Sequence, residues 1–336
     1  MADSLPPIKQ WQDVDADRFH NEIVPLDRPA HIKGLVRDWP SVQAGRTSPR
    51  ATVDYLKGFD SGNRVHAAVG SSDIKGRFFY NDDLLGVNFK RAEVPVTMAL
   101  EQTLEMMERE NPYAIAIQAI PVNKTLPGFA EMNALPLLDG SAEPTMWFGN
   151  RAMIAPHYDI DDNIACVVAG TRKFTVFPPD QIENLYVGPT LGAPGGVPIS
   201  MVDIRSPDLK RFPRFARALD VARQAVLEPG DAIYIPAVWW HGVESMEQFN
   251  LLVNYWWGGK TDSLISPNDT LLHGMLSIAR LSPAKRAAWK SFFDYYVFRL
   301  DCDPTAHLPE GLEDIVTSLN PQQKRVVLNF LREHLK

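Results

Sequence analysis

The sequence predicts a mainly β protein, with an all-β sandwich or barrel core, N-terminal α/β elements and a C-terminal helical region. Short apolar runs punctuated by Gly and Pro are frequent between residues 113 and 258, which is typical of sandwiches and barrels. After Gly258-Gly259 apolar residues recur at helical spacing, and the segment before residue 113 mixes both patterns. We therefore expect three regions: 1–112, an α/β segment packed on the barrel; 113–258, the barrel; and 259–336, the helices.

The N-terminal region contains both helix and strand signals. Acidic residues in 13–17 precede a helix that carries Phe19, because Asp is a favoured helix cap. Alternation over 29–36 predicts a strand. The Gly-rich segment 58–76 predicts a hairpin or loop, and a periodic apolar face predicts a helix over 95–109.

The central region is a series of short strands with turn residues between them. The expected strands are 113–120, 145–150, 163–169, 173–177, 225–227, 231–236 and 250–256. Jelly-roll barrels of this class can hold a metal site inside. A long stretch rich in Gly and Pro, 186–215, interrupts the strands. We expect it to cover the barrel mouth and contact substrate, with a surface insertion as the alternative.

Three amphipathic helices are expected after the barrel. The first covers 268–281, and Ser282-Pro283 and Asn320-Pro321 are start signals for two more, since Ser or Asn caps a helix and Pro suits its first turn. Their apolar faces are wide and aromatic. These faces can pack on the barrel, and we favour a homodimer formed through them.

Composition excludes several classes of function. The 336 residues carry a formal net charge of -7, so the basic surface of a nucleic-acid binder is not expected. No apolar run is long enough to cross a bilayer, and the first residues lack a signal pattern. Two cysteines, Cys166 and Cys302, cannot build a disulfide framework. We expect a cytoplasmic protein without nucleic-acid or membrane partners.

The candidate chemistry centres on His157, Asp159 and His241. His157 and Asp159 are two residues apart, so in an extended strand both side chains point to the same face. His241 ends a second strand-like run that begins at Asp231. Two imidazoles and one carboxylate form the facial ligand set of Fe(II) oxygenases, which leaves coordination positions open, although Zn or Ni fits the same ligands. A His-x-Asp pair alone is weak evidence, so the flanking residues must carry the interpretation.

Those flanking residues form a specific combination. They comprise His157-Tyr158-Asp159 with Asn163, the run Gly170–Pro179, Pro229-Gly230-Asp231, Trp239-Trp240-His241 and Val253-Asn254-Tyr255-Trp256. Together, across roughly 113–257, they resemble the cupin-like Jumonji-C group of Fe(II)/2-oxoglutarate oxygenases, with the asparaginyl hydroxylase of hypoxia-inducible factor as the member resembled most. The resemblance implies a double-stranded β-helix (jelly roll) in which His157, Asp159 and His241 hold Fe(II). It also implies 2-oxoglutarate and O2 as co-substrates, and a protein, peptide or small-molecule substrate to be hydroxylated.

The resemblance also assigns contacts for 2-oxoglutarate. Asn163 and Asn254 match asparagines near the metal-bound carboxylate, and Trp256 matches an aromatic residue near the pocket. The far carboxylate needs a cation, and the matching position is Arg172, with Lys173 as the second choice. Strand alternation allows only one of these two side chains to face inward, and a guanidinium can bind a carboxylate in two places.

Some positions depart from the pattern of that hydroxylase. A tyrosine that helps to hold the carboxylate is replaced near Ala116, and a threonine is replaced by Ile154. Its substrate-contacting Arg and Gln align near Pro198 and Ile199, so a different substrate is expected. Two alternatives therefore stay open: a metal-dependent cupin enzyme that does not use 2-oxoglutarate, and a non-catalytic binding protein of the same fold.

Overall fold

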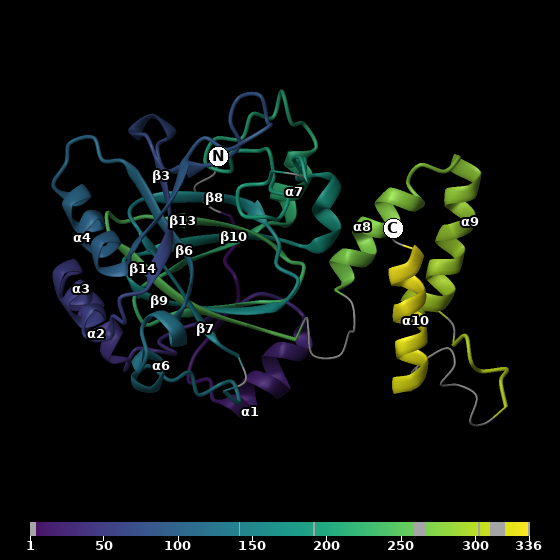
Figure 1. The fold of residues 1–336 in the computed structure, drawn as a ribbon, viewed down its shortest axis with the longest axis horizontal. Coiled ribbons are helices and arrows are strands. Elements are labelled where there is room, and N and C mark those ends of the chain that lie inside the picture. The colour runs from purple at the N-terminus through teal and green to yellow at the C-terminus, as the bar shows by residue number, and fades with distance from the viewer. Residues whose placement is uncertain are drawn as a thin grey trace. The chain divides into compact units, whose positions relative to one another are not determined.

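The structure, a computed structural model, describes residues 5–140, 142–190, 192–258, 266–301, 303–309 and 320–334. Cys302 and the expected region boundary at Gly259 lie outside these residues. The chain forms two compact units, residues 1–264 and 265–336 (Figure 1). Segments 1–112 and 113–258 both belong to the first unit, where they share one large sheet.

Two sheets form the core of the first unit. The nine-stranded sheet has the order β1 (Gln10–Trp11), β2 (Ala30–Ile32), β12 (Ala232–Ile235), β9 (Asp162–Ala169), β14 (Asn250–Trp257), β7 (Pro144–Gly149), β6 (Ala114–Pro121), β3 (Arg64–Gly70) and β5 (Lys90–Pro95). The five-stranded sheet has the order β11 (Arg223–Leu227), β10 (Arg172–Phe177), β13 (Trp240–Ser245), β8 (Ala152–His157) and β4 (Arg77–Phe78). From β7 to β14 the chain repeatedly crosses between the sheets, so residues near in sequence line opposite walls of one interior. The mainly β architecture expected from the sequence is confirmed.

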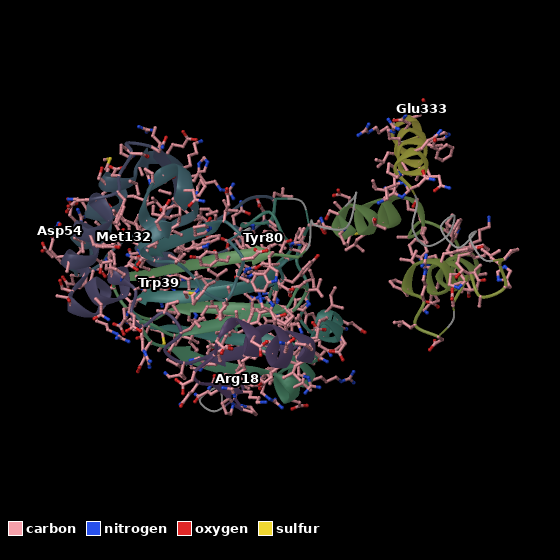
Figure 2. The ribbon with its side chains drawn as sticks, turned by 90° about the horizontal axis from the view of Figure 1, so that it is seen from below. Arg18, Trp39, Asp54, Tyr80, Met132 and Glu333 are labelled. Atoms are coloured by element: carbon pink, nitrogen blue, oxygen red, sulfur yellow. The ribbon has the colours of Figure 1, made fainter. Side chains whose placement is uncertain are left out.

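Helices accompany both sheets of this unit, and the last of them packs on the five-stranded sheet through Phe215 and Ala218. They are α1 (Ala16–Arg18) continuing into η1 (Phe19–Ile23) and η2 (Val24–Leu26), α2 (Pro40–Thr47), α3 (Pro49–Lys57), η3 (Ser72–Ile74), α4 (Val96–Met107), α5 (Val122–Thr125), α6 (Phe129–Met132), η4 (Pro179–Glu183) and α7 (Phe215–Val221). Asp15 caps the first helix by accepting from Arg18 N at 2.9 Å, as its acidic start predicts. Buried Trp39 precedes α2 within the body of this unit, whereas Asp54 lies at its outer edge (Figure 2).

One expectation for the N-terminal region was wrong, and another was right only in part. The segment 58–76 is not only a hairpin or loop, because β3 lies within it and pairs on both sides with β5 and β6. Its Val65 and Ala67 are buried, while glycines bound the strand. The strand expected over 29–36 is limited to β2, and a turn follows it. In both cases tertiary pairing, rather than local propensity, decides the strand limits.

The strand expected to end at His241 is in fact two strands. β12 pairs with β9 in the large sheet, and β13 pairs with β8 and β10 in the small one. Between them Val238 has a φ of 60°, an uncommon backbone conformation for a β-branched residue. His241 is therefore the second residue of a new strand, and the turn carries the chain from one sheet to the other.

The second unit contains α8 (Pro267–Ser277), α9 (Pro283–Phe293) continuing into η5 (Asp294–Phe298), and α10 (Pro321–His334). Ser282 caps α9 as expected, accepting from Lys285 N at 3.5 Å. Several large apolar side chains of these helices are exposed, including Leu276, Phe292 and Phe330. The homodimer stays a prediction. In the described part of the chain, no helix combines the length and apolar character needed to cross a membrane.

Candidate metal centre

Three side chains, two from neighbouring strands and one from the segment that follows the first strand, converge on one point. His157 ends β8 and lies directly opposite His241 of β13 in the strand register. Asp159 follows two residues after His157, beyond the end of the strand. The ligand atoms of the three residues lie within 4.8 Å of one another. A cation about 2.1 Å from each ligand atom would hold them up to about 4.2 Å apart, so a small inward movement suffices to bind one ion.

Both imidazoles are held with the same nitrogen facing the centre. His157 Nδ1 lies 3.0 Å from Ala155 O, and His241 Nδ1 lies 3.0 Å from Trp239 O. A carbonyl only accepts, so each Nδ1 carries the proton and each Nε2 keeps a free lone pair. His241 Nε2 is 3.7 Å from Asp159 Oδ2. Such orientation of a histidine by an outer hydrogen bond is typical of metal ligands.

A chain of amides and indoles fixes the third ligand. Trp147 Nε1 donates to Asn254 Oδ1 at 2.7 Å, and Asn254 Nδ2 donates to Asn163 Oδ1 at 3.1 Å. Asn163 Nδ2 then donates to Asp159 Oδ2 at 3.2 Å, where Trp256 Nε1 also donates at 3.0 Å. An indole can only donate and a carboxylate can only accept. Every amide in the chain therefore has one possible orientation, with its nitrogen toward Asp159.

The electrostatics keep this centre in the ionic form that a cation requires. Burial lowers the pKa of His241 to about 4, with His157 acting in the same direction and Asp159 opposing it. Burial acts to raise the pKa of Asp159, but His241, His157 and the donors Trp256 and Asn163 outweigh it, so that pKa lies below its usual value. Near neutral pH the carboxylate is charged and His241 is neutral, which is the state that binds a divalent metal.

The centre opens into a cavity of about 390 Å³ between the two sheets. All three candidate ligands line it, as do Asn163, Asn254, Trp256 and Arg172. The remaining walls are mostly apolar, with Phe78, Ile117, Phe174 and Leu252 among them. The structure thus brings every candidate residue except Lys173 to one enclosed space.

Arg172 and Lys173 point in opposite directions, as strand alternation requires. Arg172 is only 8% exposed, and its Nε is buried without a hydrogen-bond partner. Burial lowers the pKa of this guanidinium to about 10, so it stays charged at neutral pH. Lys173 Nζ instead pairs with Glu244 at 2.6 Å, on the face away from the cavity. An unpaired buried cation is costly, which points to an anionic ligand for Arg172.

Positions that depart from the pattern of the resembled hydroxylase also lie in the cavity wall. Ala116 and Ile154 both line it and offer no polar atom from their side chains. From the long segment 186–215, Val197 and Ile199 reach the same space. The expectation that this segment approaches the barrel mouth is met, and its contact with substrate stays a prediction.

Sequence reasoning missed Trp147 and Gln118, which both line the cavity. Trp147 lies on β7, whose apolar character gives no hint of a polar role. Its partner Asn254 lies 107 positions away on β14, and only the pairing of these strands brings the two together. No local signal in the sequence could have found either residue.

Comparison with known proteins agrees with this geometry. The model of the cupin-like domain family matches residues 16–263. The chain belongs to this cupin-like, JmjC-type family. It is 26% identical over 266 residues to the tRNA wybutosine-synthesizing protein 5 of Gallus gallus, covering 73% of this chain and 74% of the relative.

Other family relatives carry different names. JmjC domain-containing protein D of Dictyostelium discoideum is 32% identical over 242 residues, covering 69% of this chain and 52% of the relative. The lysine-specific demethylase JMJ31 of Arabidopsis thaliana is 35% identical over 107 residues, covering 32% of this chain and 19% of the relative. These names differ in what they act on, so family membership supplies the cupin-like fold and leaves the substrate open.

The residues present fit an iron ion. Two neutral imidazole nitrogens and one carboxylate oxygen form a mixed set with open positions toward the cavity, which suits Fe(II). The carboxylate, two imidazoles and the buried guanidinium are arranged as a metal and a small anion would require.

Proposed function

We propose that this protein is an Fe(II)/2-oxoglutarate-dependent oxygenase that hydroxylates a protein side chain or a small molecule. The observation that carries the proposal is Arg172, a buried guanidinium with an unpaired Nε, in the same cavity as His157, Asp159 and His241. A metal site alone does not need a cation deeper in the cavity. A dicarboxylate that reaches from the metal to Arg172 accounts for both.

The residues have distinct roles in this proposal. His157, Asp159 and His241 hold the iron, which when bound supplies the oxidation chemistry by coupling oxidative decarboxylation of 2-oxoglutarate to substrate oxidation. Arg172 binds the far carboxylate through charge-assisted hydrogen bonds. Asn163 and Asn254 each have a second amide hydrogen available for the near carboxylate, because their first is used in the chain to Asp159.

The surrounding residues exclude water and fix geometry. Trp256 contributes its indole N–H to Asp159 and its ring to the cavity wall. Trp147 packs edge-on against Trp256 with 5.9 Å between ring centroids. Because the ligand carboxylate is held by two neutral donors, it keeps its charge for the metal while its rotation is restricted.

One alternative has specific support. Ala116 and Ile154 place no hydrogen-bond donor where the related hydroxylase has two, which favours a cupin enzyme that binds a metal without 2-oxoglutarate. A non-catalytic binding protein is less well supported, since all three ligands and their outer hydrogen bonds are intact.

Succinate release tests the proposal directly. Protein supplied with Fe(II), 2-oxoglutarate, ascorbate and O2 is expected to form succinate even without substrate, and calorimetry with Mn(II) and 2-oxoglutarate should show binding. Binding of the metal without 2-oxoglutarate would favour the alternative enzyme. Absence of metal binding would reject both enzymatic functions and leave the binding protein.

A further inference from the structure

The charged groups of the cavity are all accounted for once the proposed ligands are bound. Among the described lining residues, those that ionise are His157, Asp159, His241 and Arg172. The metal, the Asp159 carboxylate, the doubly negative co-substrate and the Arg172 guanidinium together balance in charge. No ionised side chain is left to pair with a charged substrate group, and burying an unpaired charge costs several kcal/mol, on the order of the whole binding energy of a weak ligand.

Most uncharged polar groups of the cavity are also in use. Asn150 accepts from Ile115 N at 2.9 Å and donates to Tyr113 O at 2.6 Å. Asn163 and Asn254 belong to the chain that ends on Asp159. Their remaining hydrogens are assigned above to the co-substrate. A hydrogen-bonding group for the substrate must therefore come from another lining residue.

Gln118 is the polar side chain that remains away from Arg172, because Ser245, the other polar lining side chain without a hydrogen bond to the described residues, pairs with Arg172 in the strand register. It lines the cavity, is half-buried, and its amide makes no hydrogen bond to the described residues. It lies where the pairing of β6 with β7 shifts between Ile117 and Ile120, and the next residue, Ala119, has a φ of 51°. Such bulges are frequent beside active sites, where they redirect a side chain.

The bulge reaches both the cavity and the surface, and many of the other lining residues are apolar. Ala119 lines the cavity and is exposed. Phe78 of β4 and the loop residues Pro194, Val197 and Ile199 also line the cavity. Arg91 Nη2 anchors this loop by donating to Pro194 O at 2.7 Å. Among the described lining residues, an entering group therefore meets many apolar side chains and the unpaired amide of Gln118.

We propose that the group oxidised here is uncharged and largely apolar, an aliphatic or aromatic carbon group flanked by an amide or hydroxyl that hydrogen-bonds to Gln118. This inference rests on the proposed function, since it assumes that Arg172 faces the co-substrate. It names the substrate class of the same site. Charged side chains such as those of unmodified lysine and glutamate are excluded because the loaded cavity offers them no counter-charge.

Three matched probes test this class: the N-acetyl methylamides of leucine, lysine and glutamate, which share two amides and differ in side-chain charge. The protein is loaded with Mn(II) and N-oxalylglycine, a co-substrate analogue that is not decarboxylated. Broadening of probe NMR signals by the paramagnetic ion reports both affinity and closeness to the metal. We expect the leucine probe to bind at least about 10-fold more tightly than either charged probe, equivalent to about 1.4 kcal/mol.

Substitutions of Gln118 test whether its amide hydrogen-bonds to the substrate. Gln118→Ala is expected to weaken the leucine probe about 3- to 10-fold, the effect of one lost hydrogen bond. Gln118→Glu is expected to admit the lysine probe by supplying the missing carboxylate. Gln102→Ala, on α4 and outside the cavity, is the matched control and should change nothing.

Three outcomes would overturn the inference: a charged probe that binds as well as leucine, no effect of Gln118→Ala, or binding of none of the probes. Failure of the proposed function is seen separately, as a lack of Mn(II) or N-oxalylglycine binding by calorimetry. In that event the probes are titrated against the metal-free protein with tryptophan fluorescence, because Trp147 and Trp256 line the cavity. Arg172 then has no anionic partner, so the glutamate probe is expected to bind most tightly, and the apolar assignment, which requires the loaded cavity, is overturned.

Discussion

Two buried clusters of histidine and carboxylate stand in the same barrel, and they differ in what completes them. Asp231, at the start of β12, accepts from Lys33 Nζ at 2.6 Å and from Gly34 N at 2.9 Å. It also accepts from Glu228 N and contacts His31 Nε2, both at 3.2 Å. The cluster ties β2 to β12 and contains its own permanent cation.

Asp159 is held differently. Its Oδ2 accepts from the neutral groups of Asn163 and Trp256, while its Oδ1 accepts no hydrogen bond from the described residues. Both neighbouring imidazoles turn Nε2 inward, as their Nδ1 atoms bond to carbonyls. The Asp231 cluster is closed because a lysine neutralises it, and the Asp159 cluster stays open for a cation. The presence of a protein cation, more than the residue types, separates a structural cluster from a metal site.

The largest changes in metal affinity and in stability should come from replacing one histidine in each cluster by alanine. His157→Ala removes a direct ligand, and metal affinity is expected to fall by at least about 100-fold, since loss of an outer partner alone costs 10- to 100-fold. His31→Ala should keep metal binding and lower the free energy of unfolding by about 1.5–3 kcal/mol, through the lost hydrogen bond to a charged group. Calorimetry with Mn(II) and urea unfolding measure the two effects.

Each variant serves as the control for the other, both in the unfolding measurement and in the metal-binding measurement. Metal bound equally by His157→Ala and the unchanged protein would contradict the assignment of the centre. Loss of metal on His31→Ala, in a protein that still unfolds cooperatively, would contradict the division into open and closed clusters.

Removing the charge of the closed carboxylate should be the next largest effect. Asp231→Asn places an amide against Lys33, whose side chain is 34% exposed, so the loss costs less than for a fully buried ion pair, about 2–3 kcal/mol. Burial acts to raise the pKa of Asp231, but His31, Lys33 and backbone donors hold that pKa well below its usual range. The stabilisation is therefore complete above the unfolded pKa of about 3.9 and declines as pH falls toward the folded value. Denaturant unfolding from pH 7 downward should show the gap between the two proteins shrinking below about pH 4, and a gap that does not depend on pH would contradict this.

Arg172 extends the comparison between the two clusters. It is a buried cation without a carboxylate partner, whereas Lys33 is paired with Asp231. Arg172→Met should weaken 2-oxoglutarate binding by about 30-fold or more, because truncating one partner of a buried charge pair costs 2 kcal/mol upward. The free protein should become no less stable, because an uncompensated charge is removed. Lys173→Met is the matched control, since its partner Glu244 lies outside the cavity. Unchanged 2-oxoglutarate affinity in Arg172→Met would remove the main support for the proposed co-substrate.

Much of this arrangement was predictable from the sequence, and the reason differs from part to part. The triad could be predicted because His157 and Asp159 are close in sequence and flanked by family residues. Arg172 could be predicted because it matches the position of the family cation, and strand alternation allows only one of residues 172 and 173 to face inward. The split between β12 and β13 could not be predicted, since the turn at Val238 carries no Gly. Neither Trp147 nor the bulge at Gln118 has a local signature, because each depends on how β6, β7 and β14 pair.

The smallest expected effect tests whether Trp147 helps to orient Asp159 through the chain of amide side chains. Trp147→Phe keeps the ring and removes the donor to Asn254 Oδ1, so the Asn254 amide can turn over. Asn163 then loses its fixed partner, and the hydrogen bond to Asp159 Oδ2 is no longer enforced through the chain. We expect about a 3- to 10-fold loss of Mn(II) affinity, as for one hydrogen bond, with the free energy of unfolding nearly unchanged.

In a protein that already carries Asn254→Leu the chain is broken, so adding Trp147→Phe should cause no further loss of Mn(II) affinity. Equal losses from Trp147→Phe with and without Asn254→Leu would show that Trp147 acts by packing alone, because only a chain of directed donors makes the two substitutions dependent on each other.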